Sequence, residues 1–184
     1  MDTEIEEETE DVLKLRIEGI NEASANALRR SMVSGVPTLA VKHLDVIKNE
    51  SGIFNEALAN RVGQVPFTLP NSDDPVHIAV KKEGPCKVLA SDIQTDDEEV
   101  EPVNPGAEIT TLKEGQDLEF EGEADTGYGS EHAKHQGATV GYEKEEDGRY
   151  LFRIESTSGY SNRELLHESL DHLVSDLDKA EAEL

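Results

Sequence analysis

Alternation of apolar and polar residues predicts the first strand of this chain, over residues 12–18. One side of that segment carries three apolar residues: Leu13, Leu15 and Ile17. A helix is expected to follow, beginning after Asn21, a favourable N-cap residue, and ending at Gly35. Residues 38–47 are rich in β-branched and apolar side chains, so we expect a second strand there.

The C-terminal part of the chain carries the clearest signals. Asp147-Gly148 separates two alternating segments, 140–145 and 150–157, and this arrangement predicts a β-hairpin. Ser161 and Glu164 have the spacing of a capping box, so the last helix is expected to begin at Ser161. Along that helix four leucines recur at intervals of four, three and four residues: Leu166, Leu170, Leu173 and Leu177. A stripe this narrow is typical of a helix that pairs with another helix.

The middle of the chain reads as mostly strand and loop. Residues 76–80 alternate as a strand, and residues 87–93 are expected to be its neighbour. Residues 94–108 are acidic and contain prolines, so they are predicted to form a loop or excursion. A second long loop is expected over residues 125–137, which hold three glycines.

Composition and charge exclude several classes of function. The 184 residues carry 41 Asp and Glu against 17 Lys and Arg, a formal charge of −24. Nucleic-acid binding by net charge is therefore excluded, and no apolar run approaches the roughly 20 residues that a bilayer needs. The acidic N-terminus has no signal-peptide pattern, so a cytoplasmic protein is expected. Self-repulsion of this size needs screening, which indicates a salt-rich cytoplasm; an acidic solubility shell is the alternative.

The acidic residues are unevenly distributed. Residues 1–11 hold seven acids and no base and are predicted to be a solvated acidic tail. Residues 12–61 hold five acids and seven bases, a net charge of +2, so the other 134 residues carry −26. Because seven Lys and Arg are costly to bury, we expect a partner to cover part of the 12–61 segment.

Catalytic and metal-binding patterns are weak. His132 and His135 lie three residues apart beside Glu131, but the spacing matches neither common zinc-hydrolase motif. Gly127-Tyr128-Gly129 begins like a dinucleotide fingerprint but lacks the third glycine. The single cysteine, Cys86, excludes an internal disulfide. No catalytic residue and no metal ligand is assigned.

Three segments resemble the alpha-like subunits of cellular RNA polymerases. Residues 26–37, with Asn26-Ala27-Leu28-Arg29-Arg30, are similar to the first helix of that family. Residues 127–134 are similar to the Gly-x-Gly-x-Glu-His-Ala-Lys segment of its archaeal and eukaryotic branch, and residues 54–66 to that branch's insert-domain helix. The order and spacing indicate the archaeal members of this alpha-like family, and the charge indicates a haloarchaeal type.

The resemblance implies an α+β fold in which a discontinuous dimerisation domain holds an inserted, mostly-β domain. The dimerisation domain would comprise residues 12–45 and 140–184, and the inserted domain residues 46–139. The family's members are non-catalytic assembly subunits of DNA-directed RNA polymerase, a nucleotidyltransferase that carries out transcription. They pair with the small subunit L and, with subunit N, form a platform for the large catalytic subunits. No direct base-specific DNA contact and no membrane partner is expected.

The resemblance also implies two interfaces. Contacts with the second-largest subunit are expected from six residues: Asn26, Arg29, Arg30, Glu131, His132 and Lys134. The heterodimer with subunit L is expected to use seven: Leu28, Met32, Leu166, Leu170, Leu173, Val174 and Leu177. Many archaeal relatives carry an iron–sulfur domain, but a cluster needs about three or four thiolates, and Cys86 stands alone, so no cofactor is expected. Where relatives place an aromatic residue, this chain has His135.

Two other functions are the alternatives. One is a small metal-dependent hydrolase that uses His132 and His135. The other is a free acidic protein that mimics nucleic acid.

Overall fold

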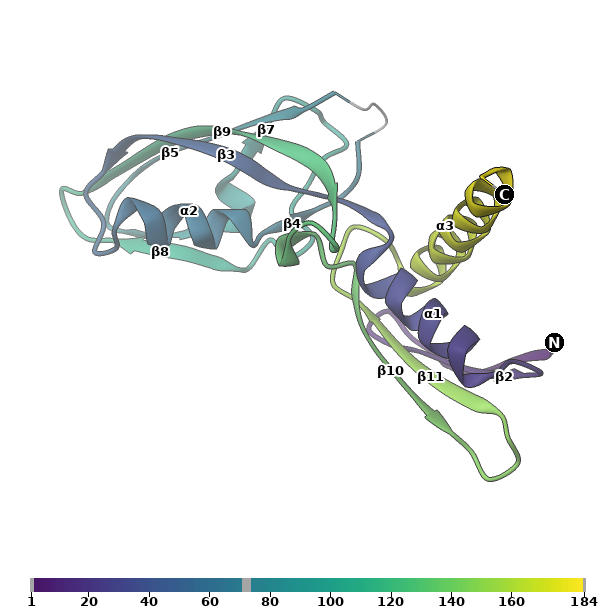
Figure 1. Ribbon diagram of the computed structural model, residues 1–184. Coiled ribbons are helices and arrows are strands. Elements are labelled where there is room, and N and C mark those ends of the chain that lie inside the picture. The colour runs from purple at the N-terminus through teal and green to yellow at the C-terminus, as the bar shows by residue number, and fades with distance from the viewer. Residues whose placement is uncertain (1, 71–73, 184) are drawn as a thin grey trace. The chain divides into compact units, whose positions relative to one another are not determined.

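The computed structural model describes residues 2–70 and 74–183 (Figure 1). The chain divides into two compact units. Unit 1 combines residues 1–37 with 128–184, and unit 2 spans residues 38–127. These divisions differ from the predicted ones, because residues 38–45 belong to a strand of the unit 2 sheet and residues 128–139 pack within unit 1.

Unit 1 contains a four-stranded antiparallel sheet in the order β1-β2-β11-β10. The strands are β1 (Asp2–Glu8), β2 (Leu13–Glu18), β11 (Tyr150–Ser156) and β10 (Ala138–Lys144). Leu15 lies opposite Phe152 and Ile17 opposite Tyr150, so alternate side chains of the two central strands form one apolar face. The predicted strand over 12–18 and the predicted hairpin are therefore confirmed.

The first residues of the chain correct one prediction. Residues 1–11 were expected to be a solvated tail, whereas Asp2–Glu8 form β1 and pair with β2. All seven residues of this strand are exposed. The segment therefore lacks the alternation of apolar and polar residues that would predict a strand. Lysine and arginine side chains elsewhere in unit 1 form ion pairs with its carboxylates, and the sequence pattern does not show those contacts.

Two helices of unit 1 begin at the predicted caps. In α1 (Glu22–Ser34), the Asn21 side chain accepts a hydrogen bond from the Ser24 amide at 2.8 Å. In α3 (Asn162–Ala182), Ser161 and Glu164 form the predicted capping box. Twelve buried side chains from the helices and the sheet form the core of unit 1, among them Met32, Phe152 and Leu165.

Over its described residues, 38–70 and 74–127, unit 2 contains a five-stranded sheet in the order β4-β3-β9-β5-β7, a two-stranded sheet of β6 and β8, and one α-helix, α2 (Figure 1). The bounds are β3 (Pro37–Asn49), α2 (Asn55–Gly63), β4 (Pro66–Phe67), β5 (Val76–Glu83), β6 (Cys86–Leu89), β7 (Gln94–Thr95), β8 (Glu108–Leu112) and β9 (Asp117–Tyr128). Eighteen buried residues form its core.

Two predictions for this region are wrong. Residues 87–93 were expected to pair with 76–80, but β6 pairs with β8, while β5 pairs with β9 and β7. The predicted loop over 125–137 is shorter, because β9 continues to Tyr128 and is followed by a short 3-10 helix, η2 (Ala133–His135). Pairing partners were misassigned because alternation identifies a strand without specifying its neighbour.

The described residues form a mixed α and β structure, in agreement with the coarse fold class. No helix within residues 2–70 and 74–183 is both long enough and apolar enough to span a membrane.

Candidate functional site

The C-terminal helix exposes a line of apolar side chains. Leu165 and Ser169 of α3 are fully buried in unit 1, and Leu166 and Leu173 are partly buried against the same core. Three residues at helical spacing point away from that core: Leu170, Val174 and Leu177, with exposed fractions of 40%, 57% and 70%. We call these three the α3 stripe. The unit's own core does not use this surface, and exposed apolar lines of this kind mark interaction sites.

Two residues predicted at the same interface lie elsewhere. Leu28 and Met32 of α1 are buried in the core of unit 1, and Met32 has no exposed surface. The Met32 side chain is therefore already packed within this chain, and its contact with another chain stays a prediction. Leu28 and Met32 are spaced i,i+4 and lie on the buried side of α1.

Small residues bring α1 and α3 together. The Ser31 hydroxyl donates a hydrogen bond to the Ser169 carbonyl at 2.8 Å, and both serines are buried. This contact satisfies a buried hydroxyl and fixes the two helices side by side. It also orients α3 so that Ser169 faces α1 while the α3 stripe remains open.

The polar side of α1 carries the first three residues of the other predicted interface. Arg29 donates from Nε and Nη2 to the Asn26 side-chain oxygen, at 3.3 and 3.2 Å. The exposed Arg30 side chain makes no hydrogen bond or ion pair with residues 2–70 or 74–183. A guanidinium without a partner stands out in a chain with 41 acidic residues, because planar carboxylate pairs are its usual contacts.

The segment after β9 packs against the C-terminal end of α1. The Ser130 amide donates to the Ser34 carbonyl at 3.2 Å, and the Gly137 amide donates to the Val33 carbonyl at 3.1 Å. These bonds satisfy carbonyls that a helix end leaves unpaired. A Cβ on Gly129 would lie 2.9 Å from the Ser34 Cα, so this close approach requires glycine.

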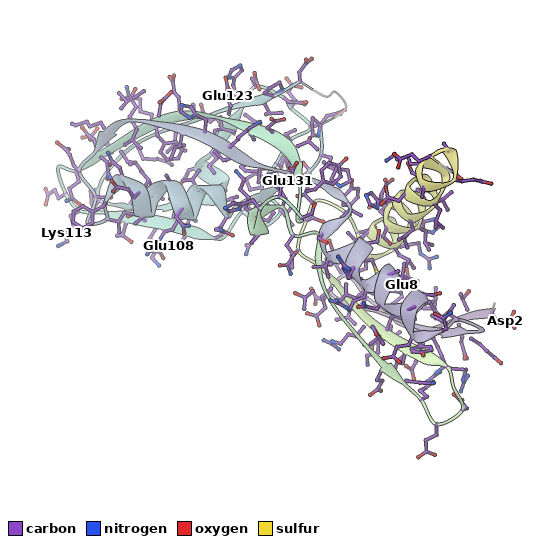
Figure 2. The ribbon with its side chains drawn as sticks, viewed as in Figure 1. Asp2, Glu8, Glu108, Lys113, Glu123 and Glu131 are labelled. Carbon is purple, nitrogen blue, oxygen red and sulfur yellow. The ribbon has the colours of Figure 1, made fainter. Side chains whose placement is uncertain are left out.

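The same segment carries the other three predicted interface residues. Glu131 (labelled in Figure 2) and His132 are exposed, and Lys134 is half-buried. The His132 Nδ1 atom accepts a hydrogen bond from the Lys134 amide at 3.1 Å and so caps η2. The structure therefore places both predicted groups of residues in unit 1, on α1 and on the segment that packs against its end.

A groove of about 670 Å³ lies between α1, α3 and this segment. Eight polar or aromatic residues contribute to its lining: Arg30, Ser31, Ser34, Tyr128, Ser130, His172, Asp176 and Lys179. The buried Nδ1 atom of His172 has no hydrogen-bond partner among the described residues, although a carboxylate oxygen of Asp176 lies 3.5 Å away. The pattern-based prediction missed His172, because nothing in its spacing along α3 indicates that it faces a groove.

The structure gives the hydrolase alternative no support. His135 is buried, with 6% of its surface exposed, while His132 already caps η2. Within residues 2–70 and 74–183, no group of three or more His, Cys, Asp and Glu side chains is placed to hold a metal ion.

Comparison with known proteins identifies the family. Residues 27–144 match the model of the RNA polymerase Rpb3/RpoA insert domain. The chain belongs to this family. The match covers the whole of unit 2 and continues into both segments of unit 1.

Three archaeal relatives in the family, each named DNA-directed RNA polymerase subunit Rpo3, illustrate the similarity. The chain is 41% identical to the Natronomonas pharaonis protein over 143 residues, which are 76% of this chain and 56% of that relative. It is 37% identical to the Halobacterium salinarum protein over 142 residues, 75% of this chain and 55% of the relative. Identity to the Thermococcus kodakarensis protein is 32% over an alignment of 188 positions, which covers 97% of this chain and 70% of the relative. The chain thus spans little more than half the length of the first two.

Proposed function

We propose that this chain is a non-catalytic assembly subunit of an archaeal, halophilic DNA-directed RNA polymerase. Family membership and the relatives' names support the complex in which it acts. The α3 stripe supports its role there, because it is an apolar helical surface that the chain's own core leaves uncovered. In this proposal unit 1 is the dimerisation domain, unit 2 is the inserted domain, and the complex works in the cytoplasm.

The α3 stripe is the proposed contact with the small subunit L. Leu170, Val174 and Leu177 would form its centre, with the partly buried Leu166 and Leu173 at its margin. Leu28 and Met32, predicted for the same contact, are buried in the core of unit 1 and would support it from within. Burial of apolar side chains on association contributes roughly 1.5–3 kcal/mol for each fully buried residue, so three such residues can hold a heterodimer together.

Substitution of the stripe tests this contact. Leu170→Glu would put a carboxylate into a dry interface, and we expect a loss of about 4 kcal/mol, which is roughly a thousandfold in affinity. Ile47→Glu is the matched control, because Ile47 is 58% exposed and lies in unit 2. Coexpression with tagged subunit L, followed by gel filtration, measures both. A Leu170→Glu chain that still elutes as a heterodimer while Ile47→Glu behaves identically would exclude the stripe as the interface.

A second surface is proposed for the second-largest subunit. It combines the polar side of α1 with three residues after β9, and its members are Asn26, Arg29, Arg30, Glu131, His132 and Lys134. The unpaired Arg30 beside the groove supports this choice, because it is an available donor for a carboxylate of a partner. Subunit N is proposed to join the same platform.

Arg30→Ala tests the second surface. We expect the pair with subunit L to form normally and recruitment of the second-largest subunit to fall by about tenfold or more, as the loss of a charged hydrogen bond implies. Arg153→Ala is the control, since Arg153 pairs with Glu155 on its own strand. Pull-down through tagged subunit L separates the two steps. Wild-type recruitment by Arg30→Ala would remove Arg30 from the interface.

We also propose that the chain needs no iron–sulfur cluster. The proposal rests on its single cysteine, Cys86, since a cluster takes about three or four thiolates. Elemental analysis for iron on anaerobically purified protein tests it: stoichiometric iron would contradict the proposal.

A further inference from the structure

The first strand is attached to unit 1 in an unusual way. None of the seven residues of β1 is buried, and its one apolar side chain, Ile5, is 44% exposed. The neighbouring strand β2 buries Leu13, Leu15 and Ile17, and it pairs with β11 along its other edge. Because β2 keeps its core face and one ladder without β1, the loss of β1 would leave the rest of the sheet in place.

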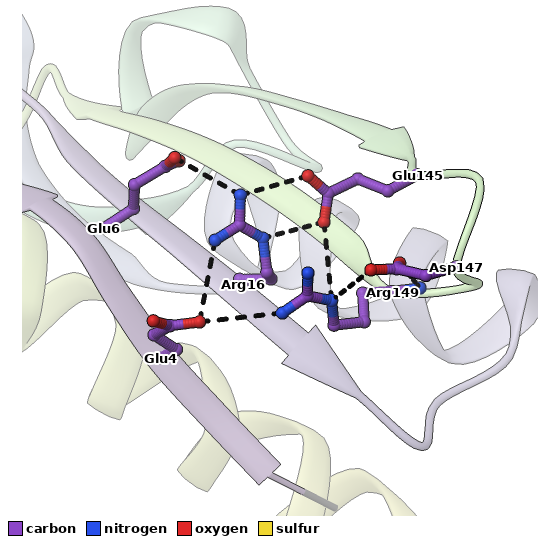
Figure 3. A network of polar contacts seen from close by, with 6 residues as sticks. All are labelled: Glu4, Glu6, Arg16, Glu145, Asp147 and Arg149. Atoms are coloured by element: carbon purple, nitrogen blue, oxygen red, sulfur yellow. Dashed lines mark hydrogen bonds and ion pairs between the residues drawn. The ribbon is translucent and has the colours of Figure 1, made fainter.

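Ion pairs and the backbone ladder hold β1 on this edge. Glu7 lies 2.6 Å from the Lys14 ammonium, and Glu8 accepts two hydrogen bonds from Arg163 of α3, at 2.9 and 2.6 Å. Figure 3 shows the remaining contacts: Arg16 reaches Glu6 at 3.2 Å and Glu4 at 3.6 Å, and Arg149 reaches Glu4 at 3.7 Å. Four cations from β2, the β10–β11 hairpin and α3 therefore face the acids of one strand: Lys14, Arg16, Arg149 and Arg163.

The cations of the network in Figure 3 keep partners if β1 leaves. Arg16, whose side chain is only 17% exposed, donates to both carboxylate oxygens of Glu145, at 2.7 and 3.1 Å. Arg149 likewise donates to Asp147 at 2.7 Å. Departure of β1 would therefore leave neither arginine unpaired, which is the usual large cost of breaking such a network, whereas the half-buried Lys14 would lose its ion pair with Glu7.

We propose that β1 is a salt-released strap: it detaches from the edge of β2 as salt concentration rises, while the rest of the chain becomes more stable. Opening separates β1 carboxylates from four nearby cations, so screening weakens the closed form. The acids of β1 are neighbours in both forms, and their mutual repulsion therefore has little effect on the equilibrium. Salt has the opposite effect on the folded state of the whole chain, which it stabilises, because it screens the repulsion within a net charge of −24.

An open strap changes what unit 1 presents. The backbone N–H and C=O groups of β2 that pair with β1 become an unpaired sheet edge. Such an edge, flanked by the four cations, suits an extended acidic segment, of which β1 itself is the intramolecular example. Salt thereby controls access to this edge.

Hydrogen exchange of the full chain, followed by mass spectrometry of its peptic fragments, tests the strap. We expect the fragment containing β1 to exchange roughly fivefold faster at 2 M than at 0.1 M potassium chloride, because several exposed ion pairs are screened together. Fragments from β11 and β9 are expected to exchange more slowly over the same range. If the β1 fragment slows in parallel with β11, or does not change, the strap does not exist.

A pair of variants identifies the contacts. Arg163→Gln removes the partner of Glu8, and we expect β1 to exchange several times faster at 0.1 M salt, with a smaller further change at 2 M. Lys179→Gln is the matched control on the same helix, since Lys179 faces Asp176. The exchanged pair Glu8→Arg with Arg163→Glu should restore slow exchange. Equal acceleration of β1 and β11 by Arg163→Gln, or an equal effect of Lys179→Gln, would overturn the proposal.

Discussion

Units 1 and 2 carry the same net charge on different cores. Unit 1 has 22 Asp and Glu against 10 Lys and Arg, and unit 2 has 19 against 7, so each has a formal charge of −12. Although the two are of similar length, the buried apolar cluster of unit 2 has 18 residues and that of unit 1 has 12, counted over residues 2–70 and 74–183. Unit 1 therefore has less apolar burial to offset the repulsion within the same net charge.

The exposed apolar residues of the two units are also distributed differently. In unit 2 they come from three separate elements: Ile47 from β3, Phe54 at the start of α2 and Val103 from a loop. In unit 1, three of them follow one another along α3 as the α3 stripe. We infer that unit 2 completes its burial by itself, whereas unit 1 completes it by association. A lean core is thus expected of a domain that a partner covers.

The largest expected difference comes from deleting one phenyl ring in each core. Phe152 and Phe120 are both fully buried, and either Phe→Ala change should cost about 3–5 kcal/mol. We expect Phe152→Ala to unfold unit 1 in the free chain, while Phe120→Ala lowers the stability of unit 2 without unfolding it. All four tyrosines lie in unit 1, so tyrosine fluorescence reports unit 1, and hydrogen exchange of β9 reports unit 2. If Phe120→Ala unfolded unit 2 while Phe152→Ala left unit 1 folded, this comparison of the two cores would be wrong.

A smaller effect is expected from one added methyl group in unit 1. A Cβ on Gly137 would lie 2.5 Å from the Val36 side chain and 2.8 Å from the Met32 carbonyl. Gly137→Ala should therefore cost about 1–3 kcal/mol by overpacking. Gly141→Ala is the control, because no atom lies within 4 Å of its added Cβ, and its effect should stay within about 0.5 kcal/mol. Urea denaturation followed by tyrosine fluorescence measures both variants.

Dilution of salt should produce a smaller difference, in the unfolding temperatures of the two units. Between 1 M and 0.1 M potassium chloride the screening length grows from about 3 to about 10 Å, so repulsion within each unit increases. We expect the unfolding temperature of unit 1 to fall by several degrees more than that of unit 2, because its core is smaller. A melting temperature that is unchanged over this range would contradict the halophilic assignment.

The smallest expected effect concerns one surface carboxyl group in each unit. Hydrogen bonds from Arg163 lower the pKa of Glu8, and hydrogen bonds from Lys87 and Thr111 lower the pKa of Glu108. Because each pKa is lowered in the folded state, each group adds stability above its unfolded-state pKa and loses that contribution as pH falls through the folded-state value. Arg163→Gln and Lys87→Gln should each raise the pKa of only their own partner, as measured by carboxyl-carbon NMR titration. A shift in both carboxyl groups would indicate long-range coupling.

Residue patterns determined most of the local structure of this chain. The helix after Asn21, the hairpin around Asp147-Gly148 and the capping box at Ser161 were all predicted, because caps and turns depend on residues within a few positions of one another. The leucine spacing on α3 likewise indicated an apolar stripe. Membership in the family was also implied by short motifs.

Tertiary structure alone decided which of these residues remain exposed. Leu28 and Met32 have the same i,i+4 spacing as Leu170 and Val174, yet the first pair is buried in the core of unit 1 and the second is open. The acidic start of the chain became a strand because Arg163, 155 positions from Glu8, lies beside it. Burial and ion pairing depend on neighbours that the fold brings together from distant positions in the sequence. The periodicity of residues along the chain does not identify those neighbours.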